Sequence, residues 1–368
     1  MQFKNYQDIR LSTLGMGNMR LPTVNPADPK AAIDYPAAHQ IIDSAYENGI
    51  NYFDTAYTYS GGESERCLGA CMTKHPRDSF YLASKYFIGA NPDYKAVFEE
   101  QLQRLQTDRI DFYLIHCLLD NNIDSYLCSG AIEYFLEQKR LGRIRYLGFS
   151  SHASLETLTR FTDHHAWDFA QLQINYYDWL YGTAKQEYAI LAERNIPIMV
   201  MEPVRGGRLA ALTPEAEAPL KAAHPDWSIA SWSLRFVRML PAVHVILSGM
   251  SSMDQLQDNL KTFDGDALTE EETALLFKSC EMFRHQVQVP CTSCRYCCEG
   301  CPAEINIPEY LNLYNAYKVD GRGALRGAEK IESVGKPADC VGCGACTGHC
   351  PQNIDTPSVM AELAGLLK

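Results

Sequence analysis

The sequence is short of three features that would each place it in a particular class of protein. It contains no run of about 18 apolar residues, which a helix needs to cross a bilayer, so we predict no membrane-spanning segment. Basic residues are outnumbered by acidic ones, 33 to 45, and the formal net charge of −12 argues against nucleic acid or an anionic membrane as a partner. No secretory leader is recognised at the N-terminus, so we expect a protein of the reducing cytoplasm.

A glycine-rich dinucleotide fingerprint is also missing. The early segment Gly15-Met-Gly17-Asn-Met-Arg20 lacks the third glycine that the phosphate-binding turn of an open, doubly wound sheet normally carries. This absence argues against an open, doubly wound sheet. The composition, 46% hydrophobic and 21% charged, is that of an ordinary globular protein.

Cysteine, in contrast, is abundant, and its spacing is the most specific signal in the chain. The 14 cysteines include two copies of the pattern C-x2-C-x2-C-x3-C-P. The copies are Cys291-Thr-Ser-Cys294-Arg-Tyr-Cys297-Cys298-Glu-Gly-Cys301-Pro302 and Cys340-Val-Gly-Cys343-Gly-Ala-Cys346-Thr-Gly-His-Cys350-Pro351. In bacterial two-cluster ferredoxins this run holds iron–sulfur clusters, and the fourth cysteine of each run ligates the other cluster.

We therefore predict two 4Fe–4S clusters that exchange their fourth ligands. One would take Cys291, Cys294, Cys297 and Cys350, and the other Cys340, Cys343, Cys346 and Cys301. Cys298 competes with its neighbour Cys297, which we prefer because it reproduces the spacing of the second copy. Zinc is an alternative that gives no reason for the third and fourth cysteine of each run, and a disulfide framework suits short secreted chains.

Upstream of these runs, short apolar stretches alternate with amphipathic ones. The predicted strands are 11–17, 50–54, 80–85, 110–116, 145–150, 169–173, 197–202 and 243–248, and the helices between them include 93–105, 132–141, 186–194 and 229–239. Such alternation indicates βα units, and eight units predict an α/β fold with a closed (β/α)8 TIM barrel, with the open sheet as competitor.

Two domains follow from this change of pattern. We predict the barrel over residues 1–286 and a small α+β ferredoxin-like iron–sulfur domain over residues 287–368. Thr269 stands three residues before Glu272, a capping-box spacing that predicts a helix over 268–284.

Polar residues stand where the predicted strands end. They are Asp54, Lys85, His116, Ser150, Gln173, Glu202 and Ser248. Strand ends of a barrel surround one mouth, which is where the active sites of such barrels lie. We therefore expect these side chains to converge.

Several of these segments resemble the aldo-keto reductase signature. They are Asn51-Tyr-Phe-Asp54-Thr-Ala-Tyr57-Thr-Tyr59-Ser-Gly-Gly-Glu-Ser-Glu, Ala83-Ser-Lys85, Asp111-Phe-Tyr-Leu-Ile-His116 and Gly142-Arg-Ile-Arg-Tyr-Leu-Gly148-Phe-Ser150. The resemblance extends from about residue 11 to residue 263, and the whole chain resembles the branch of that superfamily with a C-terminal ferredoxin-like domain. It implies a catalytic tetrad of Asp54, Tyr59, Lys85 and His116.

The chemistry of this tetrad is coherent. Carbonyl reduction needs a hydride at carbon and a proton at oxygen, and Tyr59 is the expected acid. An ordinary phenol has a pKa of about 10, which the ammonium of Lys85 would lower, while Asp54 holds that ammonium in place. His116 would orient the substrate oxygen. Tyr57 is a competing tyrosine, but Tyr59 has the family's spacing from Asp54.

The resemblance also implies a nicotinamide pocket. Its positions fall on Ser150, Ser151, Gln173, Met201, Ser248, Gln255 and Asn259. Met201 replaces the usual stacking aromatic, and Gly249 and Gln255 replace the cations that many members place on the 2′-phosphate. We therefore expect weak NADPH preference, with NADH use or reduced dependence on either NAD(H) or NADP(H).

Three functions are compatible with these features. The leading hypothesis is an oxidoreductase of small carbonyl or alcohol substrates whose clusters relay electrons to or from a redox carrier protein. The others are an NADH-dependent carbonyl reductase with structural clusters and a non-enzymatic electron-transfer or docking module. Flavin stays open as a cofactor: clusters move single electrons, nicotinamide moves a hydride, and the sequence carries no flavin motif to connect them. The loops 117–129 and 204–228, which contain Arg205 and Arg208, should shape the substrate pocket.

Overall fold

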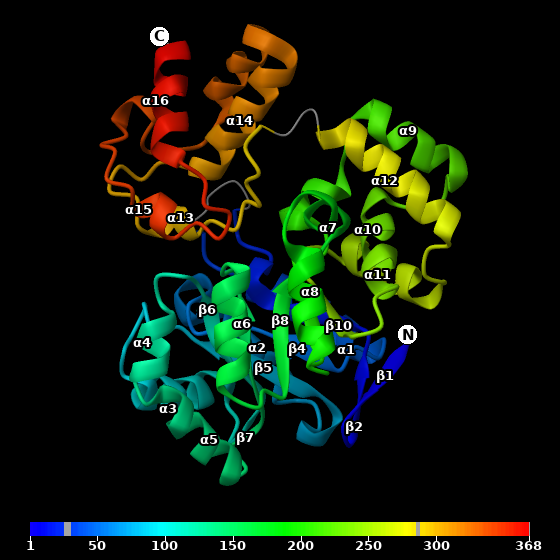
Figure 1. The fold of residues 1–368 in the computed structure, drawn as a ribbon, viewed down its shortest axis with the longest axis vertical. Helices are drawn as coiled ribbons and strands as arrows, with labels where there is room; N and C mark the ends of the chain where they lie inside the picture. The colour runs from blue at the N-terminus through cyan, green and yellow to red at the C-terminus, as the bar shows by residue number, and fades with distance from the viewer. Residues whose placement is uncertain (26–30, 285–287, 368) are drawn as a thin grey trace. The chain divides into compact units, whose positions relative to one another are not determined.

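Eight parallel strands close into a barrel in the computed structural model of the chain, which describes residues 1–25, 31–284 and 288–367 (Figure 1). Around the barrel the order is β10-β3-β4-β5-β6-β7-β8-β9. The strands are β3 (Leu14–Gly17), β4 (Tyr52–Asp54), β5 (Tyr81–Tyr86), β6 (Ile110–Leu118), β7 (Ile144–Ser151), β8 (Phe169–Gln173), β9 (Ile198–Met201) and β10 (Val243–Ser248). The predicted (β/α)8 barrel is confirmed.

By internal contacts the described chain forms two compact units. The first contains the barrel and runs through most of the chain up to Val204, then resumes over Ala230–Thr273. The second combines Arg205–Ile229 with the chain from Ala274 onward. The predicted domain boundary between residues 286 and 287 lies outside the described residues and stays a prediction.

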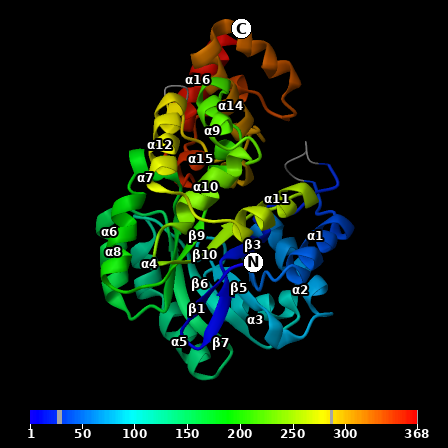
Figure 2. The ribbon, with the colours of Figure 1, turned by 90° about the vertical axis from the view of Figure 1, so that its right-hand side faces the viewer.

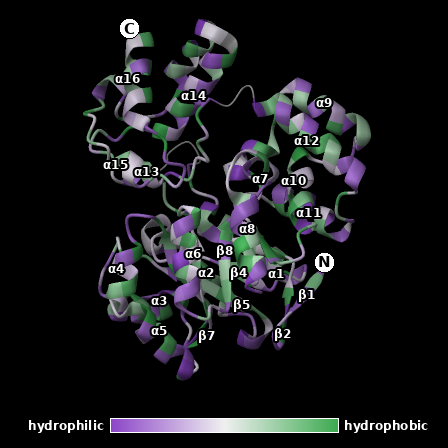
Figure 3. Cartoon of the chain, in the orientation of Figure 1, coloured by the Kyte–Doolittle hydropathy of each residue, from purple (hydrophilic) through white to green (hydrophobic). Residues whose placement is uncertain are grey.

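Helices follow the strands of the barrel in chain order. They are α1 (Tyr35–Glu47), α2 (Glu63–Met72), α3 (Tyr94–Leu105), α4 (Ile123–Cys128), α5 (Ala131–Arg140), α6 (Leu155–His164), α7 (Tyr176–Tyr181), α8 (Ala184–Glu193), α10 (Ile229–Arg238) and α11 (Met253–Asp264). Helices such as α3 and α5 combine hydrophobic and hydrophilic segments, as expected for helices with one face against the barrel (Figure 3). Side-chain caps begin five of them: Asp34, Asp93, Ser154, Asn175 and Ser252 each accept a backbone N–H.

An N-terminal hairpin precedes the barrel, and it corrects the strand predicted over residues 11–17. That stretch divides at Thr13 into β2 (Ile9–Ser12), which pairs antiparallel with β1 (Phe3–Tyr6), and β3 of the barrel (Figure 2). Thr13 donates its backbone N–H and its hydroxyl to the carbonyl of Gln2, both at 2.9 Å. These two bonds hold the chain at the point where it leaves the hairpin for the barrel.

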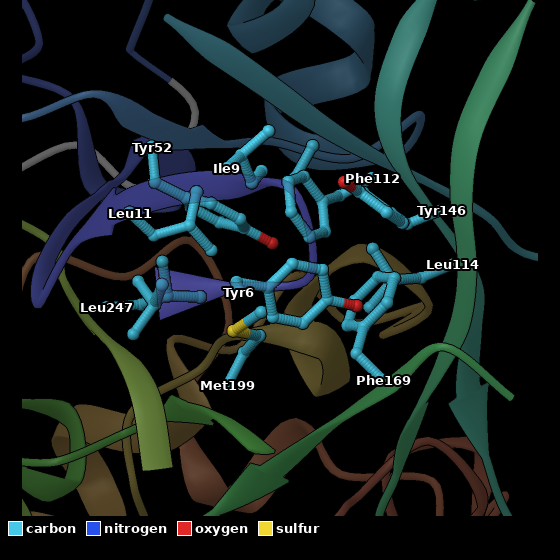
Figure 4. Close-up of a cluster of buried hydrophobic side chains, with 12 residues drawn as sticks. Tyr6, Ile9, Leu11, Tyr52, Phe112, Leu114, Tyr146, Phe169, Met199 and Leu247 are labelled. Carbon is cyan, nitrogen blue, oxygen red and sulfur yellow. The ribbon is translucent and has the colours of Figure 1, made fainter. Parts of the chain in front are cut away.

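The hairpin packs its apolar side chains against the barrel interior. Tyr6, Ile9 and Leu11 lie against residues from the early parts of the barrel strands, all of them buried (Figure 4). The central ring is Phe112, whose centroid lies 5.4 Å from Tyr6 and 4.9 Å from that of Tyr146. The cluster therefore fills the end of the barrel opposite the carboxyl ends of the strands.

The second unit is mainly helical. Its elements are η4 (Arg205–Ala210), α9 (Pro214–Ala223), most of α12 (Glu270–Arg284), α13 (Tyr296–Glu299), α14 (Ile307–Asp320), η5 (Gly321–Lys330), η6 (Pro337–Asp339), α15 (Ala345–Gly348) and α16 (Thr356–Leu366). The predicted capping box starts α12, because Thr269 N–H donates to Glu272 at 2.7 Å and Glu272 N–H returns a bond to Thr269 at 3.2 Å. One isolated parallel bridge joins Ile305 to Gly335.

A hydrophobic core of its own supports the cysteine-rich part of this unit. Ile305, Ile307, Leu311, Met360 and Leu363 are buried together with several cysteines. Among all helices in the described parts of the chain, none combines the length and apolar character needed to cross a membrane.

Removing the central ring of the barrel cluster should be costly. Phe112→Ala leaves a cavity among Tyr6, Tyr52, Tyr146 and Phe169, and we expect it to lower the free energy of unfolding by about 3–5 kcal/mol. Urea denaturation followed by circular dichroism measures this loss. Phe3→Ala, at an exposed ring of the same hairpin, is the matched control and should change stability little; an equal loss in both variants would contradict the assigned core.

Candidate active site and iron–sulfur sites

The four residues of the expected tetrad come from three strands and one turn. Asp54 is the last residue of β4, Lys85 lies near the end of β5, and His116 lies in β6. Tyr59 starts the short turn η2 (Tyr59–Gly62) that follows β4. Because the strands are parallel, their carboxyl ends meet at one edge, and the four side chains converge there.

Lys85 is the centre of the group. Its ammonium donates to Asp54 Oδ1 at 2.6 Å, to the carbonyl of Thr55 at 2.7 Å and to the hydroxyl oxygen of Tyr59 at 3.3 Å. The side chain of Lys85 is 1% exposed and that of Asp54 is 4% exposed. All three ammonium protons therefore have acceptors, and one acceptor is the phenol oxygen.

The charge of Lys85 is maintained by its partners. Burial lowers the pKa of Lys85, but Asp54 and Tyr59 outweigh burial and raise that pKa overall. Burial raises the pKa of Asp54, and Lys85 opposes this rise. With three acceptors around the ammonium, we assign the pair as ionised.

His116 is neutral. Burial, and then the charges of Lys85 and His152, hold the pKa of His116 well below its ordinary value of 6.5. Its ring lies edge-on to Tyr59, with centroids 5.9 Å apart, and Phe87 packs against it at the same distance. A neutral imidazole beside the phenol can donate one N–H to a substrate oxygen without competing for the proton of Tyr59.

A strained turn places Tyr59. Ser60 has φ of 50° and Gly62 has φ of 91°, both in the left-handed region. A Cβ on Gly62 would overlap the guanidinium of Arg104, which is buried and donates to Glu65 at 3.1 Å and to the carbonyl of Tyr57 at 3.0 Å. Glycine is therefore required at this position for the turn and Arg104 to coexist.

A buried polar network lies behind Lys85. Gln101 donates to Glu65 at 2.7 Å, to Ser84 at 2.8 Å and to the carbonyl of Lys85 at 3.1 Å, and it accepts the hydroxyl of Tyr113 at 2.6 Å. The sequence reasoning missed this network. Its signal was the Ser-Glu pair at 64–65, which is polar but wholly buried.

Tyr57 is directed away from the tetrad. Its hydroxyl donates to Glu100 at 3.0 Å, and the guanidinium of Arg104 lies 4.4 Å from its ring centroid. The two tyrosines of this turn are thus separated by their contacts, and only Tyr59 reaches Lys85.

The positions expected to bind nicotinamide lie at the carboxyl ends of β7 to β10. Ser150 accepts the backbone N–H of Cys117 at 2.8 Å, Ser151 accepts that of Ala153 at 3.2 Å, and Gln173 donates to Asp178 at 2.7 Å. These hydrogen bonds hold the three side chains in place at the carboxyl ends of the strands. Met201 ends β9 and is partly exposed.

The expected adenosine-side positions follow β10. Asn259 donates to Ser248 at 2.9 Å, and both are buried. Gln255 is exposed and accepts the backbone N–H of Ser251 at 2.7 Å. A Cβ on Gly249 would contact the aliphatic stem of Arg20 at 3.4 Å. The guanidinium of Arg20 lies 3.9 Å from the carboxylate of Glu202, and the sequence alone did not indicate that Arg20 lies beside Gly249.

The cysteines of the second unit line two separate cavities. The first cluster cavity, about 310 Å³, is lined by Cys291, Cys294, Cys297 and Cys350. The second cluster cavity, about 360 Å³, is lined by Cys301, Cys340, Cys343 and Cys346. Each cavity thus has three thiols from one run and the last thiol of the other run.

These donor sets fit a four-iron cluster. Four thiols surround each cavity, and Ser293 N–H donates to the sulfur of Cys291 at 3.3 Å, a type of bond that stabilises cluster thiolates. Cys298 lines neither cavity, although it is adjacent to Cys297. Burial raises the pKa of the Cys346 thiol, and hydrogen bonds from Thr347 and Thr356 act to lower it.

Comparison with known proteins identifies the family. Residues 13–280 match the model of the aldo/keto reductase family, and residues 290–354 match that of the 4Fe-4S dicluster domain. The first match covers well over half of the chain, so the chain belongs to the aldo/keto reductase family and carries a C-terminal 4Fe-4S dicluster domain.

Individual relatives agree with this membership. The uncharacterized oxidoreductase YqkF of Bacillus subtilis is 28% identical over 304 residues, which span 73% of this chain and 92% of that protein. L-galactose dehydrogenase of Arabidopsis thaliana is 24% identical over 304 residues, with 73% and 94% covered. The solved holo form of aldo-keto reductase AKR11C1 from Bacillus halodurans is 28% identical, has a TM-score of 0.62, and covers 76% of this chain and 96% of its own. The protein is an oxidoreductase.

The neutral state of His116 predicts a pH dependence of stability. In the unfolded chain this histidine gains a proton below about pH 6.5, whereas the folded protein does not, so stability falls as the pH decreases through that value. Between about pH 6.5 and 5.5 the free energy of unfolding of the parent protein should fall about 1 kcal/mol more than that of His116→Gln. Anaerobic urea titrations measure both; parallel decreases would show that His116 is protonated in the fold.

Proposed function

We propose that the protein interconverts carbonyl and alcohol groups on small molecules through Tyr59, Lys85, Asp54 and His116, with electrons relayed by its 4Fe–4S clusters. The observation that carries this proposal is the use of the Lys85 protons. The ammonium of Lys85 donates to the phenol oxygen of Tyr59 at 3.3 Å, so it contacts the atom whose negative charge it would stabilise once Tyr59 has given up its proton.

Proton delivery follows from this arrangement. The positive charge of Lys85 stabilises the phenolate that forms when Tyr59 gives its proton to the carbonyl oxygen. Asp54 holds the ammonium in position at 2.6 Å. In the alcohol-oxidising direction the same phenolate accepts the proton back.

His116 contributes orientation. As a neutral imidazole next to Tyr59, it can donate a hydrogen bond to the same substrate oxygen, which would stabilise the charge that develops there. The name of one relative, L-galactose dehydrogenase, describes the oxidation of an alcohol-bearing substrate, which agrees with the alcohol-oxidising direction of the proposed reaction.

A nicotinamide nucleotide is the proposed hydride carrier. Ser150, Ser151 and Gln173 would hold its carboxamide, and Ser248, Gln255 and Asn259 would lie toward the adenosine, with Met201 under the ring. The weak preference for NADPH stays a prediction, because the stem of Arg20 lies beside Gly249 but its guanidinium lies next to Glu202.

When bound, the clusters supply one-electron transfer. Cys291, Cys294, Cys297 and Cys350 would hold one, and Cys340, Cys343, Cys346 and Cys301 the other. Support comes from the two cavities, each lined by one complete set. A small-molecule substrate and a redox carrier protein are the proposed partners.

Tyr59→Phe tests the acid. The variant keeps the ring but loses the proton donor, so kcat for carbonyl reduction should fall about 10²–10⁴-fold while iron content stays unchanged. Tyr57→Phe is the matched control, because the hydroxyl of Tyr57 bonds Glu100 and not Lys85; its kcat should change little. Equal activity of Tyr59→Phe and the parent protein, measured with benzaldehyde as probe, would exclude the proposed acid.

The relay can be tested without nucleotide. Anaerobically purified protein, first checked for iron, flavin and NAD(P) content, is reduced with dithionite and supplied with benzaldehyde, and the alcohol is quantified by chromatography. Formation of alcohol above the level given by Tyr59→Phe supports electron delivery through the clusters. Turnover that strictly requires NADH and ignores the redox state of the clusters would assign them a structural role.

A further inference from the structure

The two cysteine runs differ at one corresponding position. Arg295 follows the second cysteine of the first run, and Gly344 follows the second cysteine of the second run. Both have almost the same left-handed backbone, with φ of 70° and ψ of 3° at Arg295 and φ of 74° and ψ of −1° at Gly344. The loop geometry is therefore shared, but only one copy carries a cation there.

This conformation is unfavourable for arginine. Left-handed backbone costs a residue with a Cβ about 1–2 kcal/mol, and it costs glycine nothing comparable. A residue keeps such a strained backbone only where the surrounding structure enforces it, and residues strained in this way are concentrated at functional sites.

Arg295 is among the residues that line the first cluster cavity, with Cys291, Cys294, Cys297 and Cys350. Its Nη1 atom is buried and has no hydrogen-bond partner within the described residues. A buried guanidinium donor without an acceptor costs about 1–3 kcal/mol or more. Sulfur atoms of a cluster held by the four cysteines would supply the acceptor.

Two further arginines lie in the same compact unit as this cavity. Arg205 is 3% exposed and donates to Gln352 at 3.3 Å, and Gln352 lines the first cluster cavity. Arg208 donates to Asn312 on α14. Both arginines lie in the segment predicted as a loop, but Arg205 is buried and Arg208 is only partly exposed.

The second cluster cavity has different surroundings. Its lining within the described chain is cysteine, glycine, proline and apolar residues, with Thr356 as the single hydroxyl and no charged side chain. Cys343 is exposed, and Val341 in the same loop is 71% exposed.

We propose that Arg295, supported by Arg205, gives the cluster of Cys291, Cys294, Cys297 and Cys350 a higher reduction potential than the cluster of Cys340, Cys343, Cys346 and Cys301. Reduction adds one negative charge to a cluster, and a nearby guanidinium stabilises that charge by Coulomb attraction and by hydrogen bonding to sulfur. This proposal rests on the proposed relay and gives it an order.

The order of transfer follows from exposure and potential. A low-potential one-electron carrier protein would reduce the cluster at the exposed Cys343 loop. With both clusters bound, one electron would pass from that cluster, which would be oxidised, to the cluster held by Cys291, Cys294, Cys297 and Cys350, which would be reduced. No bond forms or breaks in this step, and no proton moves.

Reciprocal variants test the assignment. Arg295→Gly makes the first run like the second and relieves the backbone strain, so folding should not suffer. Gly344→Arg places a cation in the second run, where a Cβ meets no atom within 4 Å, although the left-handed φ of 74° strains any residue other than glycine, as it does at Arg295. The readout is an anaerobic redox titration, with dithionite as reductant, followed by electron paramagnetic resonance of the full-length protein without substrate or nucleotide.

We expect Arg295→Gly to lower the higher of two midpoint potentials, equivalent to about a tenfold change in the equilibrium constant for reduction, and to leave the lower one in place. Gly344→Arg should raise the lower potential. Arg322→Gly is the control, because it removes one exposed positive charge from the same unit and should move neither. Unchanged potentials in Arg295→Gly, or a shift of the lower one alone, would overturn the proposal.

The outcome is independent of the carbonyl chemistry. Because the potentials are measured without substrate, they can shift as expected even if Tyr59→Phe retains full activity. Conversely, loss of activity in Tyr59→Phe leaves the potentials untouched, so failure of either proposal is recognised separately.

Discussion

The parallel closure of the barrel is the constraint on which the site depends. Because every barrel strand runs in the same direction, Asp54, Lys85 and His116 reach one edge from three different strands although 31 residues separate each from the next. The hairpin β1–β2 fills the opposite end with a cluster of buried rings. Stability and chemistry therefore occupy opposite ends of the barrel, and the tetrad can retain buried charge without disturbing the core.

Within that site the ammonium of Lys85 organises the other groups. A buried cation is stable only with compensating partners, and here a carboxylate, a carbonyl and a phenol oxygen supply them. The same contacts bring Tyr59 to the ammonium, whereas the pKa of His116 is lowered mainly by burial and only secondarily by the charge of Lys85. The bonds that stabilise the buried cation are thus the ones on which the proposed chemistry depends.

The cysteine-rich unit shows how a repeated motif acquires asymmetry. Each cavity is lined by three cysteines of one run and the last cysteine of the other, and the residue after the second cysteine has nearly the same φ and ψ in both runs. What differs at that position is charge, because Arg295 stands in the first run and Gly344 in the second. In the proposed relay, this difference in charge gives electron transfer between the two clusters a preferred direction.

Much of this protein was determined by sequence alone. The alternation of strands and helices, the capping box at Thr269 and the two cysteine runs depend on local periodicity and spacing, which a sequence displays directly. Tertiary structure decided what local patterns do not contain: the break at Thr13, the different partners of Tyr57 and Tyr59, and the stem of Arg20 beside Gly249. Each depends on contacts between segments far apart in the chain, and only folding brings those segments together.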